Sequence, residues 1–326
     1  MTIFIKAEAV GASGPNMKLW DFTRLENGKI RIGDRIGGPL GFENGSQVYS
    51  AMFRYEHDGH SGYEIVLSTF GPENYRQICS ATFYMLDVPG SCAEAAKFLA
   101  DRNIDILNSV SVSMVSGITM VWKMLVDLSY FGDAVQLKED FDTLKRQRSS
   151  AVAKIDAMEI DASNISDRYT KGIVPKGSPV KVKALKKAQK GASIIRHGEM
   201  DLPADFLKNL ENVKDGALVM MVADTDEWAM SLSFMAPNTR LAEFSISIPD
   251  KPGAVHAVTN VLAKSNINLL CLYTKVLVYY DRMSLEILAD TTAYEGNVSA
   301  LMRSLADRLA ELSGEYQLTA MREIKV

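Results

Sequence analysis

Residues 244–290 read FSISIPDKPGAVHAVTNVLAKSNINLLCLYTKVLVYYDRMSLEILAD, and this stretch decides the fold that we predict. Apolar residues alternate with serines over residues 244–248, which predicts a strand with one buried face. The segment Pro249-Asp250-Lys251-Pro252-Gly253 ends that strand, because proline lacks an amide donor and glycine allows a tight turn. Valines and leucines at helical spacing follow, so a helix is predicted to begin just after the glycine.

The remaining C-terminal residues continue this pattern into a complete βαββαβ order. Apolar runs over residues 269–278 and 283–289 predict two strands, and a helix over 295–312 and a strand over 316–324 follow. The pattern resembles the ACT domain, a small ferredoxin-like regulatory module. The resemblance is carried by Asp250-Lys251-Pro252-Gly253, by Leu262-Ala263 at the end of the helix, and by Asn266-Ile267-Asn268 before the second strand.

The same residues recur 163 positions earlier in the chain. Pro89-Gly90 corresponds to Pro252-Gly253, Leu99-Ala100 to Leu262-Ala263, and Asn103-Ile104 to Asn266-Ile267. The chain has 326 residues, twice this offset. We interpret the pattern as an internal duplication with a domain-sized period, which indicates a tandem array of two units and not a solenoid.

The fold class that follows is α+β, in which each half carries a small β-rich subdomain and an ACT-like domain. The predicted boundaries are 1–80 for the first β-rich subdomain, 81–161 for the first ACT-like domain, 162–190 for a basic linker, 191–240 for the second β-rich subdomain, and 241–326 for the second ACT-like domain. We expect the two ACT-like domains to pair side by side within one chain into a continuous sheet, because pairing would bury an edge strand of each.

Composition places the chain among soluble globular proteins. Hydrophobic residues make up 47% and charged residues 23%, and the net charge of −4 gives no overall attraction to nucleic acid or anionic membrane. No apolar run approaches the roughly 18 residues of a membrane span, and no secretory signal follows Met1. The three cysteines are odd in number and scattered, which favours reduced thiols and a cytoplasmic location.

The β-rich region at residues 191–234, and more loosely residues 28–70, resembles the AbrB/SpoVT swapped-hairpin module. The cue is a strand, then Leu202-Pro203 and Leu207, a glycine turn and a hairpin, with Ile194-Ile195-Arg196 matched to Arg31-Ile32 by the same offset. Such modules complete a barrel from two copies, and this chain supplies two. The resemblance implies DNA contact, whereas ordinary solvated charge is the alternative; the candidate residues are Lys29, Arg31, Arg35 and Arg196.

The ACT-like loops are the strongest candidate for a binding site. A loop that leads into a helix presents backbone N–H groups at the positive end of the helix dipole, which favours a carboxylate. The resemblance implies a pocket made by this loop and by the start of the second strand of a paired domain. The candidates are Asp250, Lys251, Gly253, Ala254 and Asn268 in the second copy, and Asp87, Val88, Gly90, Ser91 and Asp105 in the first.

The two copies differ at the start of the second strand. Asn268 offers both a donor and an acceptor, as an α-amino acid requires, whereas ionised Asp105 cannot donate. The first copy is therefore either free of ligand or selective for an amine or a metal. A structural role is the alternative for these residues, because aspartate is common in turns before Pro-Gly and asparagine is common at helix ends.

The sequence predicts a non-catalytic regulatory protein that senses a small molecule, expected to be an amino acid, at the interface of paired ACT domains. Two alternatives stay open: a ligand-responsive DNA-binding transcriptional regulator, and a regulatory subunit of an enzyme of amino-acid metabolism. No nucleophile, base and orienting acid can be assembled, so catalysis is not favoured. We predict no cofactor, no metal and no membrane partner, and a homodimer is compatible with the pattern.

Overall fold

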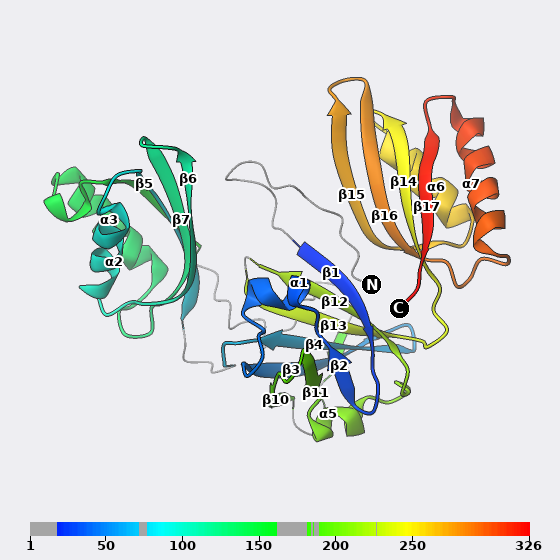
Figure 1. Ribbon diagram of the computed structural model, residues 1–326, viewed down its shortest axis with the longest axis horizontal. Coiled ribbons are helices and arrows are strands. Elements are labelled where there is room, and N and C mark those ends of the chain that lie inside the picture. The colour runs from blue at the N-terminus through cyan, green and yellow to red at the C-terminus, as the bar shows by residue number, and fades with distance from the viewer. Residues whose placement is uncertain (1–17, 72–76, 162–180, 184, 186–188, 226) are drawn as a thin grey trace.

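The computed structural model describes residues 18–71, 77–161, 181–183, 185, 189–225 and 227–326. The fold is α+β, and two βαββαβ units flank a central sheet (Figure 1). None of the described helices combines the length and the hydropathy needed to cross a bilayer.

The first unit, residues 78–161, has the predicted βαββαβ order. Its four-stranded sheet runs in the order β6-β7-β5-β8, with helices α2 and α3 on one face (Figure 1). Its elements are β5 (Ile78–Leu86), α2 (Ser91–Ala100), β6 (Asp105–Val115), β7 (Thr119–Asp127), α3 (Ala134–Arg146), the 3-10 turn η2 (Ser150–Val152) and β8 (Ile155–Asp161).

The second unit, residues 241–324, repeats this order with its sheet arranged β15-β16-β14-β17. β14, β15 and β16 each begin 163 positions after β5, β6 and β7. The elements are β14 (Leu241–Pro249), α6 (Ala254–Lys264), β15 (Asn268–Val278), β16 (Arg282–Asp290), α7 (Val298–Leu312) and β17 (Gln317–Ile324).

Side-chain caps decide where the second helix of each unit begins. Asp133 accepts a hydrogen bond from the Gln136 amide at 2.9 Å, so α3 begins at Ala134. Asn297 accepts from the Ala300 amide at 2.8 Å, so α7 begins three residues after its predicted start at 295. The apolar periodicity located both helices, and the caps set their first residues.

The central sheet is built from strands of both halves of the chain. Its seven strands run β1-β12-β13-β4-β3-β10, with β9 paired to β3, and β2 and β11 form a separate two-stranded sheet. The elements are β1 (Lys18–Arg24), β2 (Lys29–Arg31), α1 (Asp34–Gly37), η1 (Gly38–Leu40), β3 (Gln47–His57), β4 (His60–Ser68), β9 (Lys181–Lys183), β10 (Lys190–Ile194), β11 (Glu199–Asp201), α5 (Ala204–Asn209), β12 (Leu218–Asp224) and β13 (Ala229–Met235).

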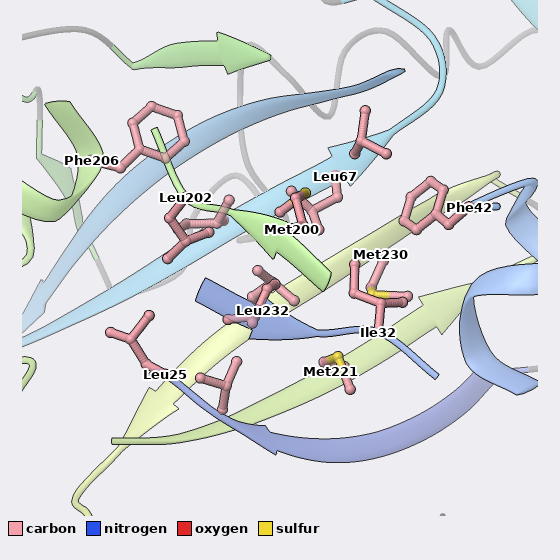
Figure 2. Close-up of a cluster of buried hydrophobic side chains, with 14 of the residues drawn as sticks. Leu25, Ile32, Phe42, Leu67, Met200, Leu202, Phe206, Met221, Met230 and Leu232 are labelled. Atoms are coloured by element: carbon pink, nitrogen blue, oxygen red, sulfur yellow. The ribbon is translucent and has the colours of Figure 1, made fainter. Parts of the chain in front are cut away.

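In the central region, strands of the first half of the chain pair with strands of the second half, and the pairs are equivalent in the two directions. β1 pairs with β12, β10 with β3, and β2 with β11. Leu25 donates its amide to the Ala217 carbonyl at 2.9 Å, and in the mirrored contact Ile195 donates to the Ser46 carbonyl at 3.0 Å. Buried side chains of both halves, among them Ile32, Leu202 and Phe206, meet in one core (Figure 2).

The repeat in the central sheet has a different offset from the one that the sequence indicated. Asn27-Gly28 and His197-Gly198 occupy equivalent left-handed turns, which places the repeat 170 positions apart. The match of Ile194-Ile195-Arg196 to Arg31-Ile32 was therefore wrong by seven residues. The offset is 171 where the two hairpins begin (Gln47 and Leu218) and 167 where they end (Ser68 and Met235). It returns to 163 at β5 and β14, because both the first hairpin and the connection after it are longer than their counterparts in the second half.

Two further expectations differ from the structure. The two units keep separate four-stranded sheets, so the prediction of a continuous intramolecular sheet was wrong. The reason is that interleaved strands of both halves form the central sheet and hold the units apart, with their helices facing outward (Figure 1). The segment that was predicted as a linker, residues 162–190, supplies β9 and the first residue of β10; residues 162–180 lie outside the described part.

Candidate functional site

The loops between the first strand and first helix of each unit adopt the same conformation. Gly90 has φ 92° and Gly253 has φ 88°, a left-handed backbone that suits glycine. Neither α2 nor α6 has a side-chain cap, in contrast to α3 and α7. The Ser91 and Ala254 amides donate to the Val88 and Lys251 carbonyls of their own loops, each at 3.2 Å. The next two amides of each helix, at positions 92–93 and 255–256, point out of the first turn and stay available to an anion.

The first residue of each of these helices is buried. Ser91 is 1% exposed and Ala254 is 1% exposed. The Ser91 hydroxyl oxygen has no hydrogen-bond partner among the described residues, although a buried hydroxyl ordinarily has one. The first unit therefore has an unused polar group at the same helix end where the second unit has a methyl group.

Each loop aspartate contacts the hairpin formed by the second and third strands of its own unit. Asp87 Oδ2 accepts a hydrogen bond from the Ser113 hydroxyl at 2.7 Å and from the Gly117 amide at 2.8 Å. These bonds, the Ser113 bond first, hold the pKa of the Asp87 carboxyl below its usual range. Asp250 Oδ2 accepts in the same way from the Tyr280 amide at 2.8 Å. Both carboxylates thus brace the turn between the second and third strands of their unit.

Asn268 and Asp250 lie at opposite ends of the second unit. Asn268 is the first residue of β15, whereas Asp250 contacts the turn that follows the last residue of β15. A strand of eleven residues spans about 30 Å at the usual rise of ~3.3 Å per residue, so one unit alone does not bring the two side chains together. The same separation holds for Asp87 and Asp105 in the first unit.

The starts of the two second strands have different neighbours. Asn268 is exposed and lies opposite Asp290 in the sheet register. Asp105 is exposed and lies opposite Asp127, so two carboxylates face each other there. Like charges directly opposite each other on paired strands are unfavourable, and a cation would relieve this contact.

Charged side chains from later in the chain reach both loops, a lysine in the first unit and a glutamate in the second. Lys154 Nζ donates to the Pro89 carbonyl at 2.9 Å beside Gly90. Lys251 forms an ion pair with Glu315 at 2.8 Å, and this hydrogen bond raises the pKa of the Lys251 ammonium. Sequence reasoning missed Lys154 and Glu315, because they stand before the last strand of each unit, more than sixty positions from the loops that they contact.

The remaining candidate, Val88, is an exposed residue of the first loop. The exposed edge strands of the two units differ in the polarity of their side chains. β6 and β15 are edge strands of their sheets. On the side that faces the helices, β15 presents Leu272 and Val276, which are 39% and 46% exposed, whereas β6 presents Ser109, Ser111 and Ser113. Only the second unit therefore has an apolar edge on its helix side.

The DNA candidates do not form a uniformly basic surface. Lys29 lies 3.9 Å from Asp201, and Arg31 stands opposite Glu199 in the sheet register. An open groove of about 790 Å³ beside them is lined by Arg24, Lys29 and Arg31, but also by Glu26, Glu199 and the C-terminal Val326. Arg35 has an interaction partner of its own, and Arg196 pairs through its backbone with Glu199. The three cations of the groove are partly offset by the carboxylates of Glu26 and Glu199.

In the described part of the chain, no three or more His, Cys, Asp or Glu side chains are placed to hold a metal ion. The three cysteines are free thiols. Burial raises the pKa of the Cys79 and Cys271 thiols to about 11, with nearby carboxylates adding to the shift at Cys79. Thiolate chemistry at these two positions is therefore disfavoured.

Comparison with known proteins finds structural likeness only. No protein-family model matches the chain, and no curated protein matches it. A structure described as a candidate glycine cleavage system transcriptional repressor is 14% identical, with 77% of this chain and 99% of that chain covered and a TM-score of 0.25. The acetolactate synthase small subunit from Thermotoga maritima is 10% identical, with 76% and 92% covered and a TM-score of 0.20.

The ligand-free regulatory subunit of aspartate kinase from Thermus thermophilus is 9% identical, with 71% and 92% covered and a TM-score of 0.20. At these identities and scores the likeness transfers no functional residue to this chain.

Proposed function

We propose that this chain is a non-catalytic regulatory protein that senses an amino acid where its second unit pairs with the second unit of another copy. One observation carries the proposal: the uncapped start of α6 and the side chain of Asn268 lie at opposite ends of the edge strand β15. When two such edges pair in antiparallel fashion, the end of one strand lies beside the start of the other. Pairing between chains would therefore join one copy's loop to the other copy's Asn268.

The groups at that junction match the two ends of an α-amino acid. The free amides at the start of α6 suit the carboxylate, because a helix N-terminus attracts anions. The Asn268 amide supplies a donor and an acceptor. Asp250 uses only Oδ2 for the Tyr280 amide, which leaves Oδ1 for an ammonium group. Leu272 and Val276 on the same edge would become buried and stabilise the pair.

The first unit has a different set of polar groups at equivalent positions. Ser91 replaces Ala254, Asp105 replaces Asn268, and the Lys154 ammonium occupies the loop. Its facing carboxylates Asp105 and Asp127 favour a cationic group over a zwitterion. We therefore propose that the first unit either binds no amino acid or selects an amine.

The test is thermal unfolding in the presence of each of the twenty amino acids at millimolar concentration. A ligand at a hundred times its Kd stabilises the folded state by about 2.7 kcal/mol, which raises the midpoint visibly. We expect one amino acid, or a related group, to do so. Asn268→Ala should abolish that shift, and Asp105→Ala, at the equivalent position of the first unit, should preserve it. A shift that survives Asn268→Ala, or no shift with any amino acid, contradicts the proposal.

A DNA-binding regulator is the second candidate, supported by the crosswise pairing of strands from the two halves in the central region. Its test is retention on DNA at low salt, which should weaken on adding salt and with Lys29→Ala or Arg31→Ala. A regulatory subunit of a biosynthetic enzyme is the third candidate, and co-purification with such an enzyme would support it.

A further inference from the structure

Each unit contacts the central region through the same three positions. In the first unit these are Ile78, Leu125 and Leu107, and in the second unit Leu241, Leu288 and Leu270, each 163 positions later. The first contact includes Phe70 and Trp228 of the central region. The second is larger and includes Trp20, Phe22, Leu218, Met220, Val222 and Met235 of the central region, with Cys271 and Ile324 of the second unit.

One of the three positions is an extra residue in its strand. The register of β6 against β7 shifts between Ile106 and Asn108, which leaves Leu107 without an opposite residue. The register of β15 against β16 shifts between Leu269 and Cys271, which leaves Leu270 in the same situation. Such a β-bulge redirects a side chain locally, and here the redirected leucine packs on the central region.

Each bulged leucine stands two residues after a candidate ligand position. Leu107 follows Asp105, and Leu270 follows Asn268. A bulge carries fewer ladder hydrogen bonds than a regular strand. A displacement of the strand start therefore moves the leucine with less disruption of the strand pairing than it would in a regular strand. The strand start and the contact with the central region are therefore joined by a bulge in each edge strand.

The tryptophans on the central side carry a local energetic cost. Trp20 Nε1 is buried and has no hydrogen-bond partner among the described residues, which is unfavourable relative to a satisfied donor. Trp228 has φ 49°, a left-handed conformation that is unusual for a bulky residue, and its carbonyl accepts from the Ser68 hydroxyl at 2.8 Å. Contacts that include such costs are poised to change when their neighbours move.

The two contacts converge on one strand of the central sheet. Trp20 of β1 lies opposite Val222 of β12. Trp228 precedes Ala229 of β13, which lies opposite Asp224 of β12. The register partners of Trp20 and of the residue after Trp228, Val222 and Asp224, therefore stand two positions apart at the end of β12, although the units themselves have separate sheets.

We propose that Leu107 and Leu270 are positioning residues that couple the two units through the end of β12, so that a change at either strand start alters the other unit. In the context of the proposed function, this makes ligand binding in one unit dependent on the state of the other. The two contacts are unequal in size, so the smaller first contact is the one that opens more readily.

The test uses the full chain without any ligand, so a failure of amino-acid sensing would leave its result unchanged. The readout is the rate at which iodoacetamide alkylates Cys271 at pH 8, resolved by peptide mass spectrometry. Cys271 packs in the second contact, where burial suppresses its thiolate, so opening of that contact accelerates the reaction. We expect Leu107→Ala, in the first unit, to raise the Cys271 rate by about two- to thirtyfold, the range of coupling between packed sites.

Val110→Ala is the matched control, because Val110 lies on the same strand, is 55% exposed and is absent from both contacts. It should leave the Cys271 rate unchanged. Hydrogen exchange of the α7 amides distinguishes opening of the contact from unfolding of the second unit. A Cys271 rate that Leu107→Ala leaves at the wild-type value overturns the coupling. The coupling is also overturned if Leu107→Ala accelerates hydrogen exchange of α7 as much as it accelerates alkylation of Cys271. Unfolding of the second unit would then explain both changes.

Discussion

At the residue scale, one contact explains why aspartate precedes Pro-Gly in both units. The Asp87 and Asp250 carboxylates each accept a hydrogen bond from a backbone amide of the turn that joins the second and third strands. In the first unit that amide belongs to Gly117 with φ 73°, and in the second to Tyr280 with φ 61°. A left-handed backbone is costly for a side-chain-bearing residue, so the carboxylate contact helps to hold Tyr280 in place.

We predict that Asp87→Asn destabilises the protein at pH 7 and that this effect fades in acid. The pKa of Asp87 is depressed in the folded state, so its stabilising contribution is present above the unfolded pKa of about 3.9 and is lost as pH falls through the lower folded value. Urea unfolding of wild type and variant at pH 7 and pH 3 measures this. Glu139→Gln, on the exposed face of α3, is the control. An equal difference between wild type and Asp87→Asn at both pH values would contradict the charge argument.

At the scale of elements, the two edge strands β6 and β15 have the same length and bulge positions but different surfaces. Natural proteins protect long edge strands with charges, bulges or covering elements, since an open edge pairs readily with another chain. β15 has a single charged residue, Lys275, and exposes leucine and valine on its helix side. β6 has serines there instead. In the pairing that we propose between copies, this difference favours β15 over β6 as the interface.

We predict that Thr274→Lys shifts the protein from dimer towards monomer, because two lysines would face each other across a paired β15 edge. Ser111→Lys, at the equivalent position of β6, should leave the dimer intact. Thr274 and Ser111 are both exposed, so neither substitution is expected to change the fold of its unit. Analytical ultracentrifugation over a range of concentrations measures the outcome. Dissociation by Ser111→Lys alone would assign the interface to the first unit.

At the scale of the whole molecule, both halves of the chain together form the central sheet and its core. Each half contributes its own hairpin, β3–β4 or β12–β13, and the remaining described pairs of the seven-stranded sheet, such as β1–β12, β13–β4 and β10–β3, join the two halves. An isolated hairpin is at best marginally stable, so the central sheet depends on both halves. The units, in contrast, have cores made from their own elements.

We predict that the separately produced halves 1–163 and 164–326 form a 1:1 complex on mixing and that neither half alone has a monomeric folded centre. The buried core of the centre contains side chains from both halves, such as Leu67 and Met230, which each half alone would expose (Figure 2). Size-exclusion chromatography with light scattering and amide exchange of β4 measure this. We expect the β4 amides to exchange fast in the isolated first half and slowly in the mixture. A protected β4 in a monomeric first half would contradict it.

The residues of the candidate site were only partly accessible to sequence reasoning. The Pro-Gly loops, the starts of their helices and the two second strands follow from local periodicity and turn residues, and the structure has them within a few positions. Lys154 and Glu315 contact the loops from distant positions, and the roles of Asp87 and Asp250 depend on hairpin turns some thirty residues away. No local pattern encodes such contacts.

The sequence by itself determined the α+β class and the βαββαβ order of both units, because alternation, helical spacing and turn residues act over short stretches of chain. Tertiary structure alone decided the rest. Strand β1 was missed because its partner β12 lies in the other half, and strand pairing across such a separation leaves no trace in local periodicity. The same crosswise pairing forms a central sheet that is separate from the sheets of the two units. The cause is physical: backbone hydrogen bonds satisfy any strand, so the global packing of buried side chains selects which strands meet.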